Sequence, residues 1–203
     1  MGLQRFGSLW LVAVVTAAGI AATAAATAAE VTSRTTYRDY PIGGSTPRSI
    51  VDYFHNHPFP GDRGPALANL RADYALAITT KERGGLCRVA TINLNVGFVV
   101  TLPRATEESR MSRGTRSMWR VAVAFARAHE DGHRRMDLQC ARTFVARAKR
   151  ISAESCWAVE SDVRRLLQSA EAACQARQVG YDLKEARRAG NLALFRAARL
   201  ARR

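Results

Sequence analysis

The spacing of apolar and polar residues divides the chain into a strand-rich first half and a helix-rich second half. Residues 33–40 are rich in threonine and tyrosine, which predicts a first strand. Residues 67–80 and 86–101 alternate between apolar and polar positions on either side of a glycine-containing turn at 81–85. This pattern predicts a β-hairpin.

Beyond residue 106 the repeat changes to steps of three and four residues, which is typical of helices. Residues 115–150 contain no proline and a single glycine, Gly132. One face of this helix would carry Trp119, Ala122, Ala126, His129, His133, Met136, Cys140 and Phe144. A second helix, over residues 156–174, should fold back on the first. We therefore expect an α+β fold in which a small antiparallel sheet packs against a long helical hairpin.

A short helix is expected between the first strand and the hairpin, with Ser45 or Thr46 as its N-cap and an end before His57. His55 and His57 could suggest a metal site. Residues two apart on a helix point in different directions, however, so we interpret them as surface or capping histidines.

The N-terminal segment predicts export. Residues 1–29 combine an early basic residue, an apolar run and small residues suited to signal peptidase, with cleavage after Ala28 or Ala29. A membrane anchor is the alternative, but the apolar run is short and no basic stop-transfer cluster follows it. We expect a signal peptide at 1–29, a domain at 30–182 and a basic, helix-prone tail at 183–203, with no membrane span after cleavage.

Four cysteines remain in the exported part: Cys87, Cys140, Cys156 and Cys174. In an oxidising compartment an even number of cysteines predicts disulfides, and no C-x-x-C spacing favours a zinc site. Two disulfides are therefore expected, and the sequence allows three connectivities.

The chain carries a net charge of +14, which would attract it to anionic surfaces such as envelope polymers. No nucleic-acid-binding module is recognisable, so we expect no specific nucleic-acid partner. The scattered arginines fit a solvated surface better than a binding patch.

The chemistry concentrates in Ala128-His129-Glu130-Asp131-Gly132-His133, an H-E-x-x-H pattern inside the first long helix. Two histidines four apart lie on one helix face and can bind one zinc ion. The glutamate beside the first histidine can deprotonate a water held at the metal. The pattern predicts His129 and His133 as ligands and Glu130 as the general base of a zinc peptidase.

Several segments together resemble an uncharacterised family of exported bacterial proteins, a domain of unknown function predicted to be secreted zinc-dependent proteases. They are the tyrosine-rich strand, Cys87-Arg88-Val89, Thr101-Leu102-Pro103-Arg104, Trp119, the H-E-x-G-H segment, Cys156 and Tyr181-Asp182. The resemblance covers residues 37–182. It implies a disulfide between Cys87 and Cys156, which leaves Cys140 and Cys174 as a second pair.

The chain departs from the family pattern after Tyr181-Asp182, where residues 183–188 place arginine at the position of an expected histidine. Arginine stays protonated and cannot bind zinc, although a catalytic zinc usually has three protein ligands. The extended metzincin pattern is absent too, since Met136 and Gln139 occupy its further positions. A carboxylate remains as the third ligand: Glu171, level with His133 in a hairpin that turns near Ser152, or Asp182.

Two functions follow from these residues. The first is a periplasmic or secreted zinc-dependent metalloprotease. It would cleave peptide or protein substrates with a metal-bound water molecule that Glu130 activates. The second is a non-catalytic envelope protein of the same fold, with a degenerate metal site, that binds an anionic partner through its basic surface.

The geometry of a helical hairpin that turns near Ser152 bears on the second disulfide. It places residue 164, rather than Cys174, opposite Cys140.

Overall fold

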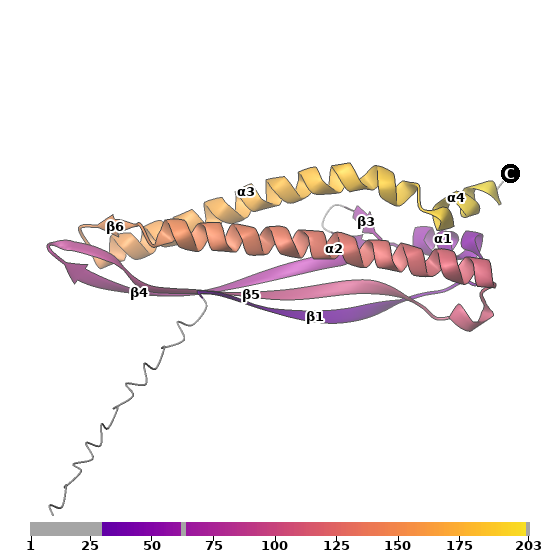
Figure 1. Ribbon diagram of the computed structural model, residues 1–203, viewed down its shortest axis with the longest axis horizontal. Helices are drawn as coiled ribbons and strands as arrows, with labels where there is room; N and C mark the ends of the chain where they lie inside the picture. The colour runs from indigo at the N-terminus through magenta and orange to yellow at the C-terminus, as the bar shows by residue number, and fades with distance from the viewer. Residues whose placement is uncertain (1–29, 62–63, 202–203) are drawn as a thin grey trace, which may run out of the picture.

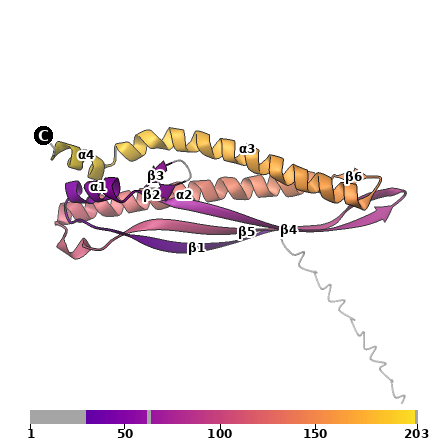
Figure 2. The same cartoon turned by 180° about the vertical axis from the view of Figure 1, so that it is seen from behind.

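The computed structural model describes residues 30–61 and 64–201, so the expected signal peptide lies outside the described residues. The fold is α+β, as expected: a mixed sheet lies under a long helical hairpin, which covers one face (Figure 1). Seen from behind, the two long helices again lie over one face of the sheet, and the tip of the β4–β5 hairpin extends beyond them (Figure 2). No helix of the described segments is long and apolar enough to cross a membrane.

The sheet is built on the predicted hairpin of β4 (Asn69–Arg83) and β5 (Leu86–Ala105). Gly84 and Gly85 form its turn with φ of 62° and 75°, values that glycine adopts without steric cost. The strand order is β1-β5-β4, with the short β6 (Ser152–Ala153) also paired to β5.

β1 (Val31–Ile42) is the strand expected at the start of the domain, and it pairs with β5 in parallel, from Val31↔Leu94 to Ile42↔Ala105. A parallel neighbour cannot follow through a tight turn, so a long excursion separates the two strands. That excursion contains α1 (Pro47–Asn56), the small β2 (Phe59–Gly61) and β3 (Gly64–Ala66) pair, and β4.

Alternating residues of β5 form the centre of the main core. These side chains point toward the helices and are at most 3% exposed: Ile92, Leu94, Val96, Phe98, Val100 and Leu102. The intervening Thr91, Asn93 and Asn95 are exposed on the opposite face. The two-residue repeat of the sequence is therefore that of a strand with one covered face. The sheet was expected to be antiparallel, but it is mixed, because β1 pairs with β5 in parallel.

The helical hairpin consists of α2 (Arg113–Ala148) and α3 (Cys156–Gly190). Ser112 caps α2 and Ser155 caps α3, each accepting a hydrogen bond from the backbone N–H three residues later. Both expected disulfides form. Cys87–Cys156 ties β5 to the start of α3, and Cys140–Cys174 joins the two helices.

In the helical hairpin, α3 is shifted along α2 relative to the position that a symmetric turn near Ser152 would give. The expected register was therefore wrong. Cys140 faces Cys174 rather than residue 164, a shift of ten residues or about 15 Å of helix. The connector, residues 149–155, is partly extended because β6 pairs with β5 at Cys87 and Arg88. Seven residues of extended chain reach about 23 Å, so α3 can begin well beyond the end of α2.

A second, smaller core lies at the other end of the molecule, where α4 (Ala193–Leu200) packs on α1 and α2. The helix-prone segment after residue 182 thus completes α3 and then forms α4, with Leu194 fully buried. As predicted, Thr46 is the N-cap of α1 and Pro47 its first residue.

Candidate metal centre

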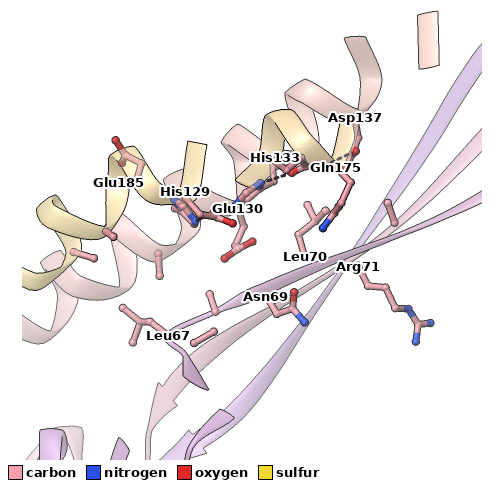
Figure 3. Close-up of a pocket in the computed structure, with 18 of the residues that line it drawn as sticks. Leu67, Asn69, Leu70, Arg71, His129, Glu130, His133, Asp137, Gln175 and Glu185 are labelled. Carbon is pink, nitrogen blue, oxygen red and sulfur yellow. Dashed lines mark hydrogen bonds and ion pairs between the residues drawn. The ribbon is translucent and has the colours of Figure 1, made fainter. Parts of the chain in front are cut away.

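A groove of about 620 Å³ runs between β4, α2 and α3. It contains the histidines of the H-E-x-x-H segment, which α2 presents from one side, and carboxylates from both helices (Figure 3). The groove lies at the rim of the main core, where the edge of β4 passes beneath α3.

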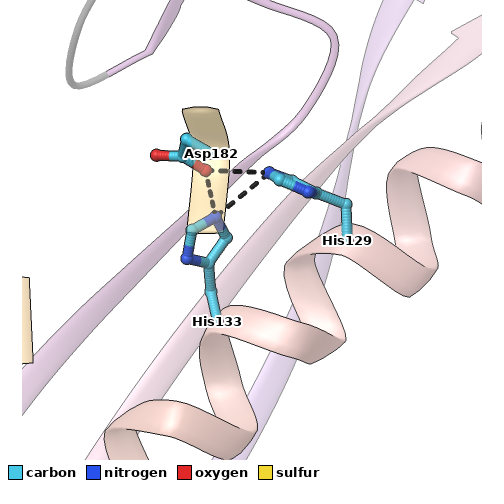
Figure 4. A group of neighbouring side chains, drawn as sticks. All are labelled: His129, His133 and Asp182. Atoms are coloured by element: carbon cyan, nitrogen blue, oxygen red, sulfur yellow. Dashed lines mark hydrogen bonds and ion pairs between the residues drawn. The ribbon is translucent and has the colours of Figure 1, made fainter. Parts of the chain in front are cut away.

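Three side chains converge in this groove: His129, His133 and Asp182 (Figure 4). The Asp182 Oδ1 atom is 2.7 Å from His133 Nε2 and 3.1 Å from His129 Nε2, and the two Nε2 atoms are 3.1 Å apart. We call these residues the three-donor cluster. The offset of the hairpin brings Asp182 here, because it moves the C-terminal half of α3 over the histidines.

His133 is held by a chain of buried hydrogen bonds. Its Nδ1 atom donates to Gln178 Oε1, and Gln178 Nε2 donates to Asp137 Oδ1 at 2.6 Å. Tyr74 of β4 also donates to Asp137, at 3.1 Å. Since Nδ1 carries the proton, the Nε2 lone pair of a neutral His133 faces the rest of the three-donor cluster.

Burial changes the acid–base behaviour of the surrounding groups. Desolvation, together with the neighbouring His133, lowers the pKa of His129, although Asp182 opposes this effect. His129 therefore tends to be neutral, with a lone pair available for a metal ion. Desolvation also raises the pKa of Asp137, while its hydrogen bonds from Gln178 and Tyr74 act in the opposite direction.

The converging acceptor atoms of the three-donor cluster need a proton or a metal ion between them. A carboxylate oxygen and the lone pair of a neutral His133 cannot satisfy each other without a proton or a metal ion. Two imidazoles and a carboxylate are a known donor set for zinc, whose ligand atoms lie about 2.0–2.2 Å from the metal. Tetrahedral ligands at that distance are about 3.3 Å apart, close to the spacing of the three-donor cluster. The residues present therefore fit a zinc ion.

Tyr181 packs against both histidines. Its ring stacks on His129, with centroids 5.0 Å apart, and meets His133 edge-on at 5.1 Å. The same ring covers Gly132, where a Cβ atom would lie 2.4 Å from the tyrosine hydroxyl. The glycine between the two histidines is thus required by Tyr181, which in turn fixes the planes of both imidazoles.

Glu130 lines the groove beside the three-donor cluster and is only 4% exposed. Its carboxylate extends from α2 into the space above Leu70 and Asn69 of β4 (Figure 3). Glu130 thus lies next to the three-donor cluster without being part of it, a position that suits a general base in the groove.

Of the two carboxylates considered as a third ligand, the structure brings Asp182 to the histidines. Glu171 lines the far end of the groove, eleven residues or about three turns along α3 from Asp182, and is exposed. Arg188, in the segment where the family pattern has histidine, lies over the ring of Phe125 and pairs with Glu185. His55 lies in the last turn of α1 and His57 is the C-cap residue of that helix; both bond to backbone carbonyls.

Sequence reasoning missed the groups that support the ligands. Asp137 lies four residues after His133 on α2, and Gln178 lies four residues before Asp182 on α3. Both therefore lie one turn from a ligand on the same helix face, and that spacing was the available signal. Tyr74 could not be found in this way, because it comes from β4.

The fold and site define a class: an α+β protein in which a helical hairpin carries two histidines and a carboxylate beside a sheet edge. Residues 37–190 match the family described as "Bacterial protein of unknown function (DUF922)". That match covers well over half of the chain, so the protein belongs to this family. Comparisons with curated proteins and with solved structures gave no match.

Proposed function

We propose that the protein is an exported zinc-dependent hydrolase of peptide bonds. The observation that carries this proposal is the three-donor cluster in the groove, with Glu130 beside it. Three protein ligands leave a fourth tetrahedral position for the reaction, whereas a structural zinc is usually closed by four. His129, His133 and Asp182 would hold the ion.

When bound, zinc would polarise a substrate carbonyl and lower the pKa of a water molecule. The chain's own residues would do the rest. Glu130 would accept the proton of the attacking water and pass it to the leaving amine. Gln178 and Asp137 would keep His133 in the tautomer that offers Nε2 to the metal.

The proposed location outside the cytoplasm has two supports. Residues 1–29 have the composition of a signal peptide. The two disulfides are compatible with an oxidising compartment, where thiols persist in the paired form.

Metal analysis and one conservative substitution test the proposal. The purified chain from residue 30 should contain about one zinc per molecule, and His129→Ala should lose it because one ligand is gone. Glu130→Gln should keep the zinc and lose at least about 100-fold of its activity on unfolded β-casein, because the proton acceptor is missing.

His57→Ala is the matched control, since His57 is an exposed histidine at the C-cap of α1; it should keep both zinc and activity. A protein without stoichiometric zinc, or a Glu130→Gln variant as active as the wild type, would contradict the proposal. Salt-dependent association with anionic polymers in the absence of zinc would instead favour a non-catalytic binder, given the net charge of +14.

A further inference from the structure

Within the described residues, the edge of β4 that faces the groove has no partner strand. In the strand order β1-β5-β4, β4 is the outer strand, and no strand of the described segments pairs with its second edge. Alternate residues of such an edge offer a backbone N–H and C=O to whatever lies beside them.

The residues that line the groove indicate that β4 presents this edge rather than one of its faces. Side chains of a strand alternate between faces, so a groove over one face would be lined by every second residue. Instead, the first four consecutive residues of β4, 69–72, all line the groove, as do residues 66–68 just before the strand. Their backbone therefore forms part of its wall.

Two independent lengths describe the groove. On the strand side it extends from Leu67 to Tyr74, of which Asn69 to Tyr74 belong to β4 and span about 17 Å at the rise of a strand. Along α3 it extends from Glu171 to Ala189, about 27 Å at the rise of a helix. The two lengths correspond to about six and nine residues of extended polypeptide, and Asp182 lies within this span rather than at one end.

The walls also suit alternating side chains. Apolar groups come from all three elements: Leu67 and Leu70 beside the strand, Phe125 on α2 and Leu183 on α3. Leu183 is 73% exposed, so its side chain is accessible to a chain bound in the groove.

We propose that the groove binds an extended polypeptide segment of about seven residues as an added strand on the free edge of β4. Backbone hydrogen bonds to β4 would supply affinity, and the apolar walls would receive alternate side chains. The bound chain would pass over the three-donor cluster and continue beyond it in both directions. This inference rests on the proposed function and specifies its substrate: internal bonds of unfolded chains, not terminal residues or folded proteins.

Photo-crosslinking tests where such a chain binds. Because strand addition uses the backbone, an unfolded protein of unrelated sequence is a valid probe, and we choose β-casein. The crosslinking residue p-benzoylphenylalanine replaces Ala186, an exposed alanine of α3 that lines the groove, in the zinc-loaded Glu130→Gln protein. The matched control carries it at Ala173, an exposed alanine of α3 outside the groove.

Crosslinks to casein should form at position 186 and not at position 173. Hydrogen exchange then tests the pairing itself: alternate amides of β4 between Asn69 and Tyr74 should exchange about tenfold more slowly when nine-tenths of the protein is bound. The free edge of β1 serves as the control for nonspecific pairing and should not change.

The outcomes separate this inference from the proposed function. Equal or absent crosslinking at the two positions, or unchanged exchange in β4, would overturn the inference even if the wild-type protein contains zinc and cleaves casein. Release of single amino acids in place of internal fragments would overturn it as well. Edge binding by a protein that neither holds zinc nor hydrolyses casein would support the inference and reject the proposed function.

Discussion

Residue 132 is a glycine at a position where the ring of Tyr181 leaves no space for a side chain. An added Cβ would lie 2.4 Å from the tyrosine hydroxyl and 2.7 Å from the ring carbon that carries it. These atoms belong to a ring held between two imidazoles, so they cannot move away without disturbing His129 or His133. A single methyl group would therefore affect both packing and ligand geometry.

We predict that Gly132→Ala destabilises the protein by about 1–3 kcal/mol, the usual cost of overpacking, and weakens zinc binding. Gly180→Ala is the control, because Gly180 lies in α3 with nothing within 4 Å of the added atom. It should stabilise the protein by about 0.5–1 kcal/mol through helix propensity. Denaturant unfolding and chelator competition measure both effects, and equal behaviour of the two variants would refute this role of Tyr181.

At the scale of elements, the site depends on how far α3 is shifted along α2. The sequence predicts both helices, the β-hairpin and the two histidines, because each follows from a local repeat. It does not predict the shift, which depends on β6, a two-residue strand in the connector that pairs with β5 far along the chain. A symmetric turn places Glu171 level with His133, whereas the shift of ten residues places Tyr181 and Asp182 there.

The shift of α3 along α2 also explains the second disulfide. Cys140 and Cys174 do not face each other in a symmetric hairpin, yet they are bonded. A Cys140–Cys174 bond sets the register of the two helices, and in that register Asp182, not Glu171, lies level with His133. β1 is a further case: its threonines and tyrosines predict a strand, but its parallel pairing with β5 is a non-local choice.

We predict that the two disulfides differ in their effect on the metal site. Replacing Cys140 and Cys174 by serine should cost about 3–4 kcal/mol and weaken zinc binding, because this bond fixes α3 against the histidines. Replacing Cys87 and Cys156, which close a longer loop at the far end of α3, should cost slightly more stability and leave zinc affinity nearly unchanged. Weaker zinc binding in the second variant than in the first would contradict this assignment.

The whole molecule has two cores joined by α2. The larger lies between the sheet and the helical hairpin, and the smaller contains α1, α4 and the first turns of α2. The sequence suggested a basic tail after residue 182, because its arginines and lysine greatly outnumber its one acidic residue, Glu185. Leu192 and Leu194 nevertheless pack into the smaller core.

Leu194→Ala should therefore destabilise the protein by about 2–5 kcal/mol, because the leucine is fully buried in the smaller core. Leu200→Ala, on the same helix but 69% exposed, should change stability by less than about 0.5 kcal/mol. Thermal unfolding of the two variants gives the comparison. A Leu194→Ala protein as stable as the wild type would mean that α4 does not hold this end of the molecule together.

The Cys140–Cys174 bond also constrains how the chain can change in length. His133 precedes Cys140 by seven residues, and Asp182 follows Cys174 by eight, about two helical turns in each case. One residue inserted in either interval would rotate His133 or Asp182 by about 100° around its helix relative to the disulfide. The three side chains would all still be present, but they would no longer converge. The lengths of these two intervals therefore determine whether the three-donor cluster can form. Insertions and deletions should be confined to the turn of the β-hairpin and to the loops outside them.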